Sequence, residues 1–209
     1  GIKNTHMTPI IDRQIFFGNP NIMGSQISPD GSLISFIKPY EGMLNIWVKK
    51  KEASYEEALP ITNDQSRPIT SYFWSRDSKY ILYVQDKGGD ENFHIYAVDP
   101  FQAEAGIPSS RNITDYGAIR AMIMALPKND HGSIYVGIND RDAAWHDLYK
   151  IDIATGDRTL VLENTESFNA FYFDLDYELR LASKATADAG AEILAKTADG
   201  WRSLITSTG

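Results

Sequence analysis

A phrase that recurs four times along the chain constrains its fold more than any other feature. Each copy consists of a short apolar strand, a tight turn built on Asp or Gly, a second apolar strand, a third strand rich in aromatic residues and a polar loop. The turn aspartates of successive copies are 47, 53 and 46 residues apart, at Asp30, Asp77, Asp130 and Asp176. A repeat of this length is typical of a four-stranded propeller blade. The sequence therefore predicts an all-β fold, a partial β-propeller of about four four-stranded antiparallel blades.

The second strands of the repeats are apolar on both faces. Residues 33–37, 80–84 and 134–138 show this pattern, whereas a strand with one face in water would alternate apolar and polar residues. Stacking of the blades face to face would cover both sides of such strands. Helical periodicity is nearly absent, and only residues 55–59 could form a turn or two of helix. A sandwich or lectin-like fold is the alternative architecture.

The repeat also predicts how the chain is divided. The blades are expected at residues 24–65, 66–115, 116–165 and 166–209. Before them, residues 1–7 read as a cloning remnant that ends at a start-type Met, and residues 8–23 read as an opening segment that packs on the first blade or completes another. The fourth blade already contains four candidate strands, so it needs no strand from the opening segment. This organisation favours a sector of a larger propeller over a closed four-bladed ring.

Composition excludes several classes of function. The formal net charge is −8 and the pI is near 5.0, which argues against a nucleic-acid partner. The longest basic run, residues 49–51, is followed by three glutamates and is interpreted as a solvated loop. The chain has no cysteine, so it has neither a disulfide framework nor a cysteine nucleophile. No run of apolar residues is long enough to suggest a membrane span. The compartment is left open between the cytoplasm and the periplasm, with a bacterial source favoured.

Two histidines are the candidates for acid-base chemistry. His94 and His146 each lie beside acidic and aromatic residues. We expect them instead to occupy equivalent places at the start of the third strands, where the imidazole bonds the backbone of a loop. No residue of this chain is therefore predicted to be catalytic.

The acidic residues do not form a recognisable metal motif. Asp86, Asp90 and Glu91 lack the regular alternation of an oxygen-ligand loop for calcium, and His6 and His131 have no partner at metal-ligand spacing. We expect neither a metal nor a cofactor.

Three stretches of the chain match the pattern of a known family. Residues 9–20, followed by 27–31 and 44–48, resemble the start of the propeller of prolyl oligopeptidase-family (S9) serine peptidases, in the branch of the acylaminoacyl-peptidases and dipeptidyl-aminopeptidases. The phrase Gly-Gly-Asp-Glu-Asn-Phe-His-Ile-Tyr at residues 88–96 resembles the signature of its second blade, and residues 141–156 resemble the third. The resemblance extends over nearly all of residues 8–208.

This resemblance implies a function that lies partly outside the chain. In the family, a propeller caps an α/β-hydrolase domain that carries a Ser-Asp-His triad, and the pair cleaves short peptides. The nucleophile of such a domain lies on a Gly-x-Ser-x-Gly elbow, and no such elbow occurs in these 209 residues. The resemblance therefore implies a non-catalytic gating fragment whose partners are its own C-terminal hydrolase domain and peptide substrates, and no nucleic acid or membrane. A homo-oligomer is expected if open blade edges pair, and a TolB-like propeller that binds a protein or a ligand is the alternative.

One acidic pair is the candidate contact with substrate. In some relatives, two acidic residues of the propeller hold the free amino terminus of the substrate through charge-assisted hydrogen bonds. Asp90 and Glu91 are adjacent carboxylates, although the family motif for this role is different and lies elsewhere. The competing interpretation is a polar hairpin tip between the second and third strands.

Overall fold

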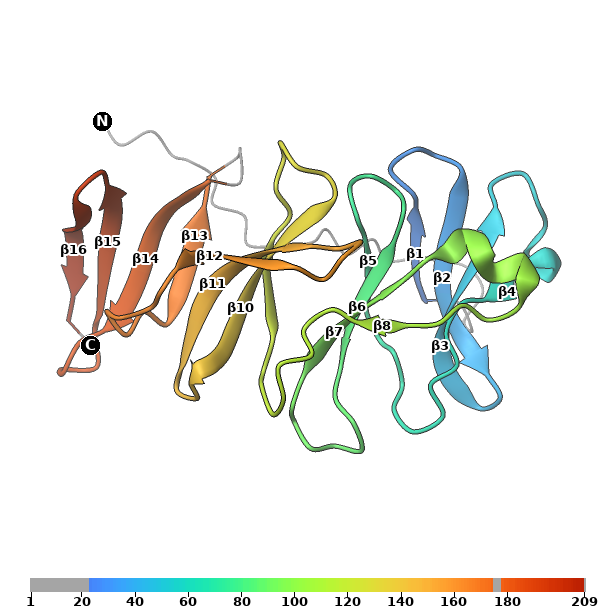
Figure 1. Ribbon diagram of the computed structural model, residues 1–209, viewed down its shortest axis with the longest axis horizontal. Helices are drawn as coiled ribbons and strands as arrows, with labels where there is room; N and C mark the ends of the chain where they lie inside the picture. Colours follow the sequence, from blue (N-terminus) through green and yellow to red (C-terminus); the bar gives the residue numbers. More distant parts are fainter. Residues whose placement is uncertain (1–22, 175–177, 209) are drawn as a thin grey trace.

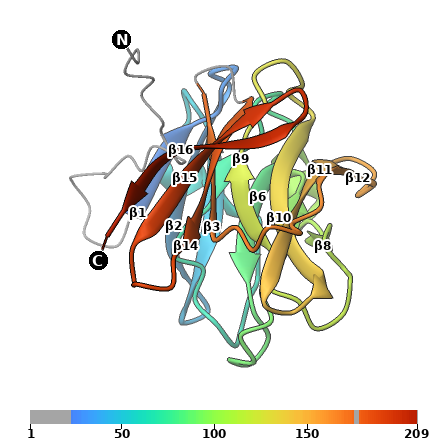
Figure 2. The ribbon, with the colours of Figure 1, turned by 90° about the vertical axis from the view of Figure 1, so that its left-hand side faces the viewer.

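The computed structural model describes residues 23–174 and 178–208, which form four β-sheets stacked one behind another (Figures 1 and 2). Each sheet has four antiparallel strands in chain order. The first sheet contains β1 (Met23–Ile27), β2 (Leu33–Tyr40), β3 (Met43–Lys50) and β4 (Leu59–Pro60). The second contains β5 (Phe73–Trp74), β6 (Ile81–Gln85), β7 (His94–Val98) and β8 (Arg111–Asn112). The third contains β9 (Met122–Ala125), β10 (Ser133–Asp142), β11 (Trp145–Asp152) and β12 (Arg158–Leu162). The fourth contains β13 (Ala170–Phe173), β14 (Leu179–Ala185), β15 (Ala191–Thr197) and β16 (Gly200–Ser207).

The predicted fold class is confirmed, because four antiparallel meanders of four strands are the sheets of propeller blades. Two short 3₁₀ helices connect third and fourth strands: η1 (Tyr55–Glu57) and η2 (Pro100–Ala105). The first lies in the segment where a helical turn was expected. The second was not expected, although Asp99 caps it by accepting a hydrogen bond from the backbone N–H of Phe101, and Pro100 follows the cap. The predicted opening segment, residues 8–23, lies outside the described residues except for Met23, which begins β1.

A repeated hydrogen-bond network holds the turns between first and second strands. Ser28 donates its hydroxyl to Asp30 at 2.7 Å, and the same hydroxyl accepts from the backbone N–H of Leu33 at 3.0 Å. Ser75 repeats both contacts, with Asp77 at 2.6 Å and the backbone N–H of Tyr80 at 3.1 Å. In this way a serine two residues before the turn aspartate closes the turn.

The third and fourth turns use different groups. Asp130 accepts from the Ser133 hydroxyl at 2.9 Å and from the N–H of Gly132 at 3.3 Å. Asp176, the turn aspartate expected in the fourth repeat, lies outside the described residues. The carboxylate that accepts the backbone N–H of Glu178 is that of Asp174, at 3.0 Å.

Each pair of neighbouring sheets shares an apolar core. Ile81 of β6 packs into the core between the first and second sheets, whereas the next residue, Leu82, packs into the core between the second and third. Adjacent residues of a strand point to opposite faces, so a sheet between two others needs apolar residues on both. This explains why the second strands lack alternation. A smaller core, which includes Leu148, Phe173 and Leu179, joins the third and fourth sheets.

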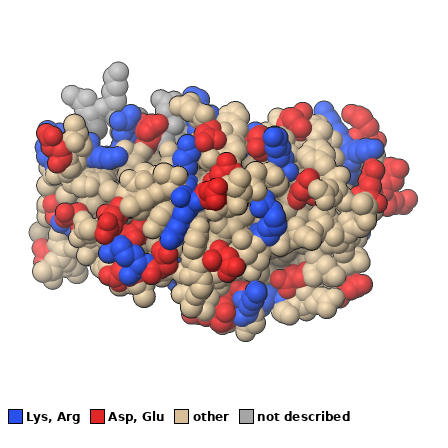
Figure 3. Space-filling model, viewed as in Figure 1, with Lys and Arg blue, Asp and Glu red and all other residues tan. Residues whose placement is uncertain are grey.

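The four sheets form an open sector. In Figure 1 the first and fourth sheets lie at opposite ends of the long axis, and each has a neighbour on one face alone in the described part of the chain. Apolar side chains are exposed on β16, where Leu204 is 42% and Ile205 is 53% accessible. A ring closed by these four sheets is therefore not formed. Figure 3 shows acidic and basic side chains interspersed over the visible face, with no continuous basic patch.

Candidate functional site

The loops of the stack gather on two opposite faces. One face carries the hairpins between second and third strands together with the connections from each sheet to the next, and we call it the crossover face. It comprises residues 41–42, 61–72, 86–93, 113–121, 143–144, 163–169 and 186–190. The opposite face, which we call the turn face, carries the remaining loops. Because a meander reverses direction at each strand, loops far apart in the sequence come together on each face.

The long hairpin loop of the second sheet is anchored by a buried carboxylate. Asp86 is 3% accessible, and its Oδ1 accepts a hydrogen bond from Nε of Arg67 at 3.1 Å. Its Oδ2 accepts from the backbone N–H of Glu91 at 3.1 Å. Asp86 therefore ties the hairpin to the connection that leads into its own sheet.

The structure places Asp90 and Glu91 at the exposed tip of this loop. Asp90 accepts the backbone N–H of Asn92 at 3.0 Å and that of Lys87 at 3.3 Å, and the first of these bonds lowers the pKa of Asp90. Its carboxylate thus helps to form the turn. Glu91 has φ of 60° and is exposed, and among the described residues its carboxylate has no ion pair. Of the two predicted residues, Glu91 is the one whose carboxylate takes no part in forming the turn.

Both candidate histidines bond a loop carbonyl, as expected. His94 donates from Nδ1 to the carbonyl oxygen of Thr114 at 2.8 Å, and His146 donates from Nε2 to that of Arg120 at 2.7 Å. The expectation that the two occupy equivalent positions is wrong. Val84 and Gly137 are each seven residues after the turn aspartate of their repeat, so they occupy equivalent positions. Ile95 lies opposite Val84, and Leu148 lies opposite Gly137. This register makes His94 the counterpart of Asp147, which also directly precedes its aligned apolar residue.

Asp147 holds the corresponding loops of the third sheet. It is 1% accessible and accepts two hydrogen bonds from Arg141, at 2.8 and 2.9 Å, and one from the backbone N–H of Asn164 at 2.7 Å. Burial opposes its ionisation, but the bonds from Arg141 and Asn164 outweigh burial and hold the pKa of Asp147 below its ordinary value. The side chain of Asn164 then bonds the carbonyl oxygens of His146 and Phe168.

A pocket of about 330 Å³ lies between the third and fourth sheets on the crossover face. Its lining is mostly apolar and includes Met122, Met124, Trp145, His146, Phe168 and Phe171. Burial lowers the pKa of His146, so its imidazole is neutral near pH 7. The sequence interpretation missed this pocket. A signal was present in Gly137, which stands where the first and second repeats have Ile37 and Val84.

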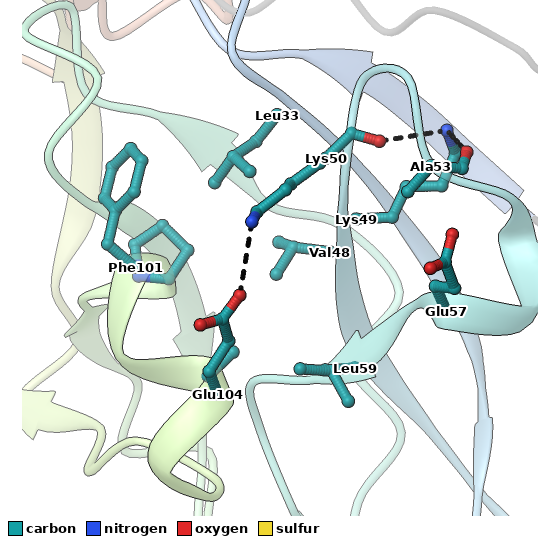
Figure 4. Close-up of a pocket in the computed structure, with 11 residues that line it drawn as sticks. Leu33, Val48, Lys49, Lys50, Ala53, Glu57, Leu59, Phe101 and Glu104 are labelled. Carbon is teal, nitrogen blue, oxygen red and sulfur yellow. Dashed lines mark hydrogen bonds and ion pairs between the residues drawn. The ribbon is translucent and has the colours of Figure 1, made fainter.

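A second pocket, of about 420 Å³, lies on the turn face between the first sheet and η2 (Figure 4). Lys50 and Glu104 face each other across it, with Nζ 3.5 Å from Oε1, and Leu33, Val48 and Leu59 lie around this pair. Glu57, which also lines this pocket, accepts the backbone N–H of Ser54 at 3.0 Å.

Lys49 completes the lining of the second pocket. It is 6% accessible, and its Nζ donates to the carbonyls of Lys50, Lys51 and Ala53 at 3.3, 3.2 and 2.8 Å. Only part of the basic run is therefore solvated, which corrects the sequence interpretation. Each charged side chain of this pocket thus has a hydrogen-bond or ion-pair partner within the protein.

Among the described residues, no three His, Asp or Glu side chains come together in a way that could hold a metal ion. Within residues 23–174 and 178–208, no helix has both the length and the apolar character needed to cross a membrane.

The chain is similar to two curated peptidases. It is 39% identical to dipeptidyl aminopeptidase BIII of Pseudoxanthomonas mexicana over 193 residues, which are 92% of this chain and 27% of that protein. It is 30% identical to dipeptidyl peptidase family member 6 of Caenorhabditis elegans over 187 residues, which are 88% of this chain and 25% of that protein. The chain thus spans about a quarter of the length of these relatives. No protein-family model matches it.

A solved prolyl endopeptidase has a similar fold. The TM-score is 0.60 over 89% of this chain and 28% of the other, at 14% sequence identity. An identity this low bears on the fold alone.

Proposed function

Because the chain is homologous to the β-propeller region of prolyl oligopeptidase-family (S9) peptidases, we propose that it is the substrate-access sector of a larger serine peptidase that cleaves short peptides. The observation that carries this proposal is the 39% identity over 92% of the chain to a dipeptidyl aminopeptidase, 27% of whose length the match covers. The triad and its hydrolase domain would belong to the rest of that larger protein.

The open stack of sheets supports the gating role. Further blades would cover the exposed apolar face of the fourth sheet and complete a ring with a narrow central opening. A ring of this kind beside an active site excludes folded proteins, confines short peptides and limits the access of bulk water.

The activity is tested on the longer protein that contains this chain. We expect it to hydrolyse dipeptidyl chromogenic substrates, to lose this activity when the serine of its Gly-x-Ser-x-Gly elbow is changed to alanine, and to lack turnover when reduced to these 209 residues. A longer protein with neither the elbow nor hydrolysis would favour the alternative, a TolB-like binding module. Hydrolysis by the purified 209-residue chain would contradict its non-catalytic assignment.

Within this function, we propose that Glu91, with Asp90 beside it, binds the protonated amino terminus of the peptide substrate. Glu91 is exposed, its backbone N–H is held by the buried Asp86, and its carboxylate has no ion pair among the described residues. Glu91 also adopts a left-handed backbone conformation, which is costly for a residue with a side chain and is often found at functional positions. Asp90 fixes the turn and adds negative potential.

The assignment predicts charge-dependent binding. Calorimetric titration of the chain with Ala-Ala-amide should show weaker binding after Glu91→Gln, by about tenfold, since a charge-assisted hydrogen bond is replaced by a neutral one. N-acetyl-Ala-Ala-amide, which has no amino-terminal charge, should bind the original chain and the variant equally.

Glu41 provides a matched control for this experiment. It is also exposed, also has a positive φ, of 49°, and also lies at the tip of a hairpin between second and third strands. Glu41→Gln should leave the binding of Ala-Ala-amide unchanged. An equal loss in both variants, or no loss in Glu91→Gln, would remove Glu91 from the site.

A further inference from the structure

The third repeat departs from the first two at one strand position that faces the next sheet. Ile37 and Val84 occupy this position in the first and second sheets, opposite Ile46 and Ile95, whereas Gly137 occupies it in the third. The backbone of Gly137 does not require glycine, because its φ is not positive. The reason for glycine therefore lies in packing.

Two neighbouring side chains occupy the space that a side chain at position 137 would need. A Cβ on Gly137 would lie 2.4 Å from Cε of Met124 and 3.3 Å from Cβ of His146. Both residues line the pocket between the third and fourth sheets. Glycine thus allows Met124 and His146 to lie close against β10, and they form one wall of the pocket.

Two of the residues that line the pocket, His146 and Asn169, also have a polar group that the described part of the protein leaves unused. His146 donates from Nε2 to the carbonyl of Arg120, so its Nδ1 carries a lone pair, for which no partner is found in residues 23–174 and 178–208. Asn169 uses its Oδ1 to accept the Ser183 hydroxyl at 2.9 Å, so its amide group is still able to donate. One acceptor and one donor match the N–H and C=O of a peptide unit.

From these observations we propose that this pocket, formed by Met122, Met124, Trp145, His146, Phe168 and Phe171, is a subsite for a bulky apolar side chain of a bound peptide. The proposal rests on the proposed function, because it takes a peptide to be the ligand of the crossover face. A volume of about 330 Å³ accommodates one large side chain with part of its backbone. The two methionines are flexible and polarisable, so several apolar side chains are accepted rather than one.

The proposal is tested by direct binding, without catalysis. The probes are N-acetyl-phenylalaninamide, N-acetyl-leucinamide and N-acetylglycinamide, titrated into the chain with ¹³C-methyl-labelled methionine and followed by NMR. The phenylalanine and leucine probes should shift the methyl signals of Met122 and Met124 saturably, while that of Met43 on β3 stays in place. The glycine probe should bind at least tenfold more weakly, because it lacks the apolar side chain.

Two alanines in one hairpin provide a blocking variant and its control. Ala144 lines the pocket and its exposed neighbour Ala143 does not. Ala144→Phe should abolish the shifts caused by the phenylalanine probe, and Ala143→Phe should retain them. If Ala144→Phe does not fold, as judged by circular dichroism, Ala170→Leu on the opposite wall replaces it.

Shifts that do not saturate, that are equal for the glycine probe, or that survive both blocking variants would overturn the proposal. These outcomes are independent of Glu91 and of hydrolysis, because the probes have no free amino group and no reaction is measured. If the longer protein shows no peptidase activity but the probes bind, the pocket is still a site for apolar side chains. If the probes do not bind but the longer protein hydrolyses peptides, the peptidase proposal stands without this subsite.

Discussion

His146 and Asp147 are neighbours in sequence but ionise in opposite senses. Burial disfavours the charged form of His146, so its pKa is lowered and the ring is neutral near pH 7. The carboxylate of Asp147 is also buried, yet Arg141 and the N–H of Asn164 keep it ionised. The difference in pKa comes from the hydrogen-bond partners. His146 bonds a neutral carbonyl group, whereas Asp147 bonds the cationic side chain of Arg141.

The lowered pKa of His146 predicts how stability depends on pH. Below pH 6.5 the unfolded chain binds a proton at this position more readily than the folded chain, so the contribution of His146 to stability is present above pH 6.5 and is lost as the pH falls toward its lower folded pKa. His146→Gln should therefore show a smaller fall in melting temperature between pH 7.5 and pH 5 than the original chain.

Thermal unfolding in buffers of equal ionic strength measures this difference. His131→Gln, which removes an exposed imidazole, provides the matched comparison. Parallel curves for the original chain and His146→Gln would show that the imidazole is equally basic in the folded and unfolded states.

At the scale of elements, the same hairpin differs between blades. The hairpin between β2 and β3 has two residues, Glu41 and Gly42, whereas that between β6 and β7 spans residues 86–93. Extensions of a repeat generally lie on one face, often the binding face. Here the extension carries Glu91, and the hydrogen bonds of Asp86 hold this loop in place.

The glycine at position 137 of β10 leads to a prediction about the stability of the chain. Gly137→Val should destabilise the chain by about 1–3 kcal/mol, since its side chain would press against Met124 and His146. Gly132→Ala is the matched control, because no atom lies closer than 3.7 Å to its new Cβ and its φ is not positive. We expect it to change stability by less than about 0.5 kcal/mol. Urea unfolding compares the two, and equal stabilities would contradict the packing argument.

At the scale of the whole molecule, apolar cores join each pair of neighbouring sheets in the described residues, and the two end sheets each lack a neighbouring sheet on one side. A sheet in the middle is stabilised from both sides, whereas the first and fourth sheets have one neighbour each among the described residues. Repeat arrays need terminal units with a polar outer face to stay soluble alone. The exposed Leu204 and Ile205 of β16 are unlike such a cap.

From the exposed apolar side chains of β16 we predict that the 209-residue chain associates with itself. Light scattering should show a mass that rises with concentration, because pairing of copies would cover the exposed strands and apolar side chains. Ile205→Lys on the end sheet should reduce the association. Leu160→Lys, at the equally exposed Leu160 on β12 of the third sheet, should not. A strictly monomeric mass at high concentration would contradict the prediction.

The fold could be predicted from the sequence, whereas only part of the site could. The spacing of the turn aspartates and the doubly apolar second strands specify stacked four-stranded sheets, because each repeat carries its own turn and strands. A hairpin tip was the competing interpretation of Asp90 and Glu91, and the structure places both residues in the loop between β6 and β7, while their contact with substrate stays a prediction. The roles of Asp86 and Arg67 could not be predicted, because their contact joins two loops of different length whose approach depends on the packing of the sheets.

The sequence by itself determined that this chain forms β-blades and that it lacks a nucleophile elbow, because both are properties of local pattern and composition. Only the tertiary structure decided that the four sheets form an open stack, that His94 corresponds to Asp147 and not to His146, and that Gly137 makes room for one wall of a pocket. These features depend on strand register and on distances between residues of different sheets. Neither can be read from a repeat, because a repeat gives the order of its parts and not the contacts between them.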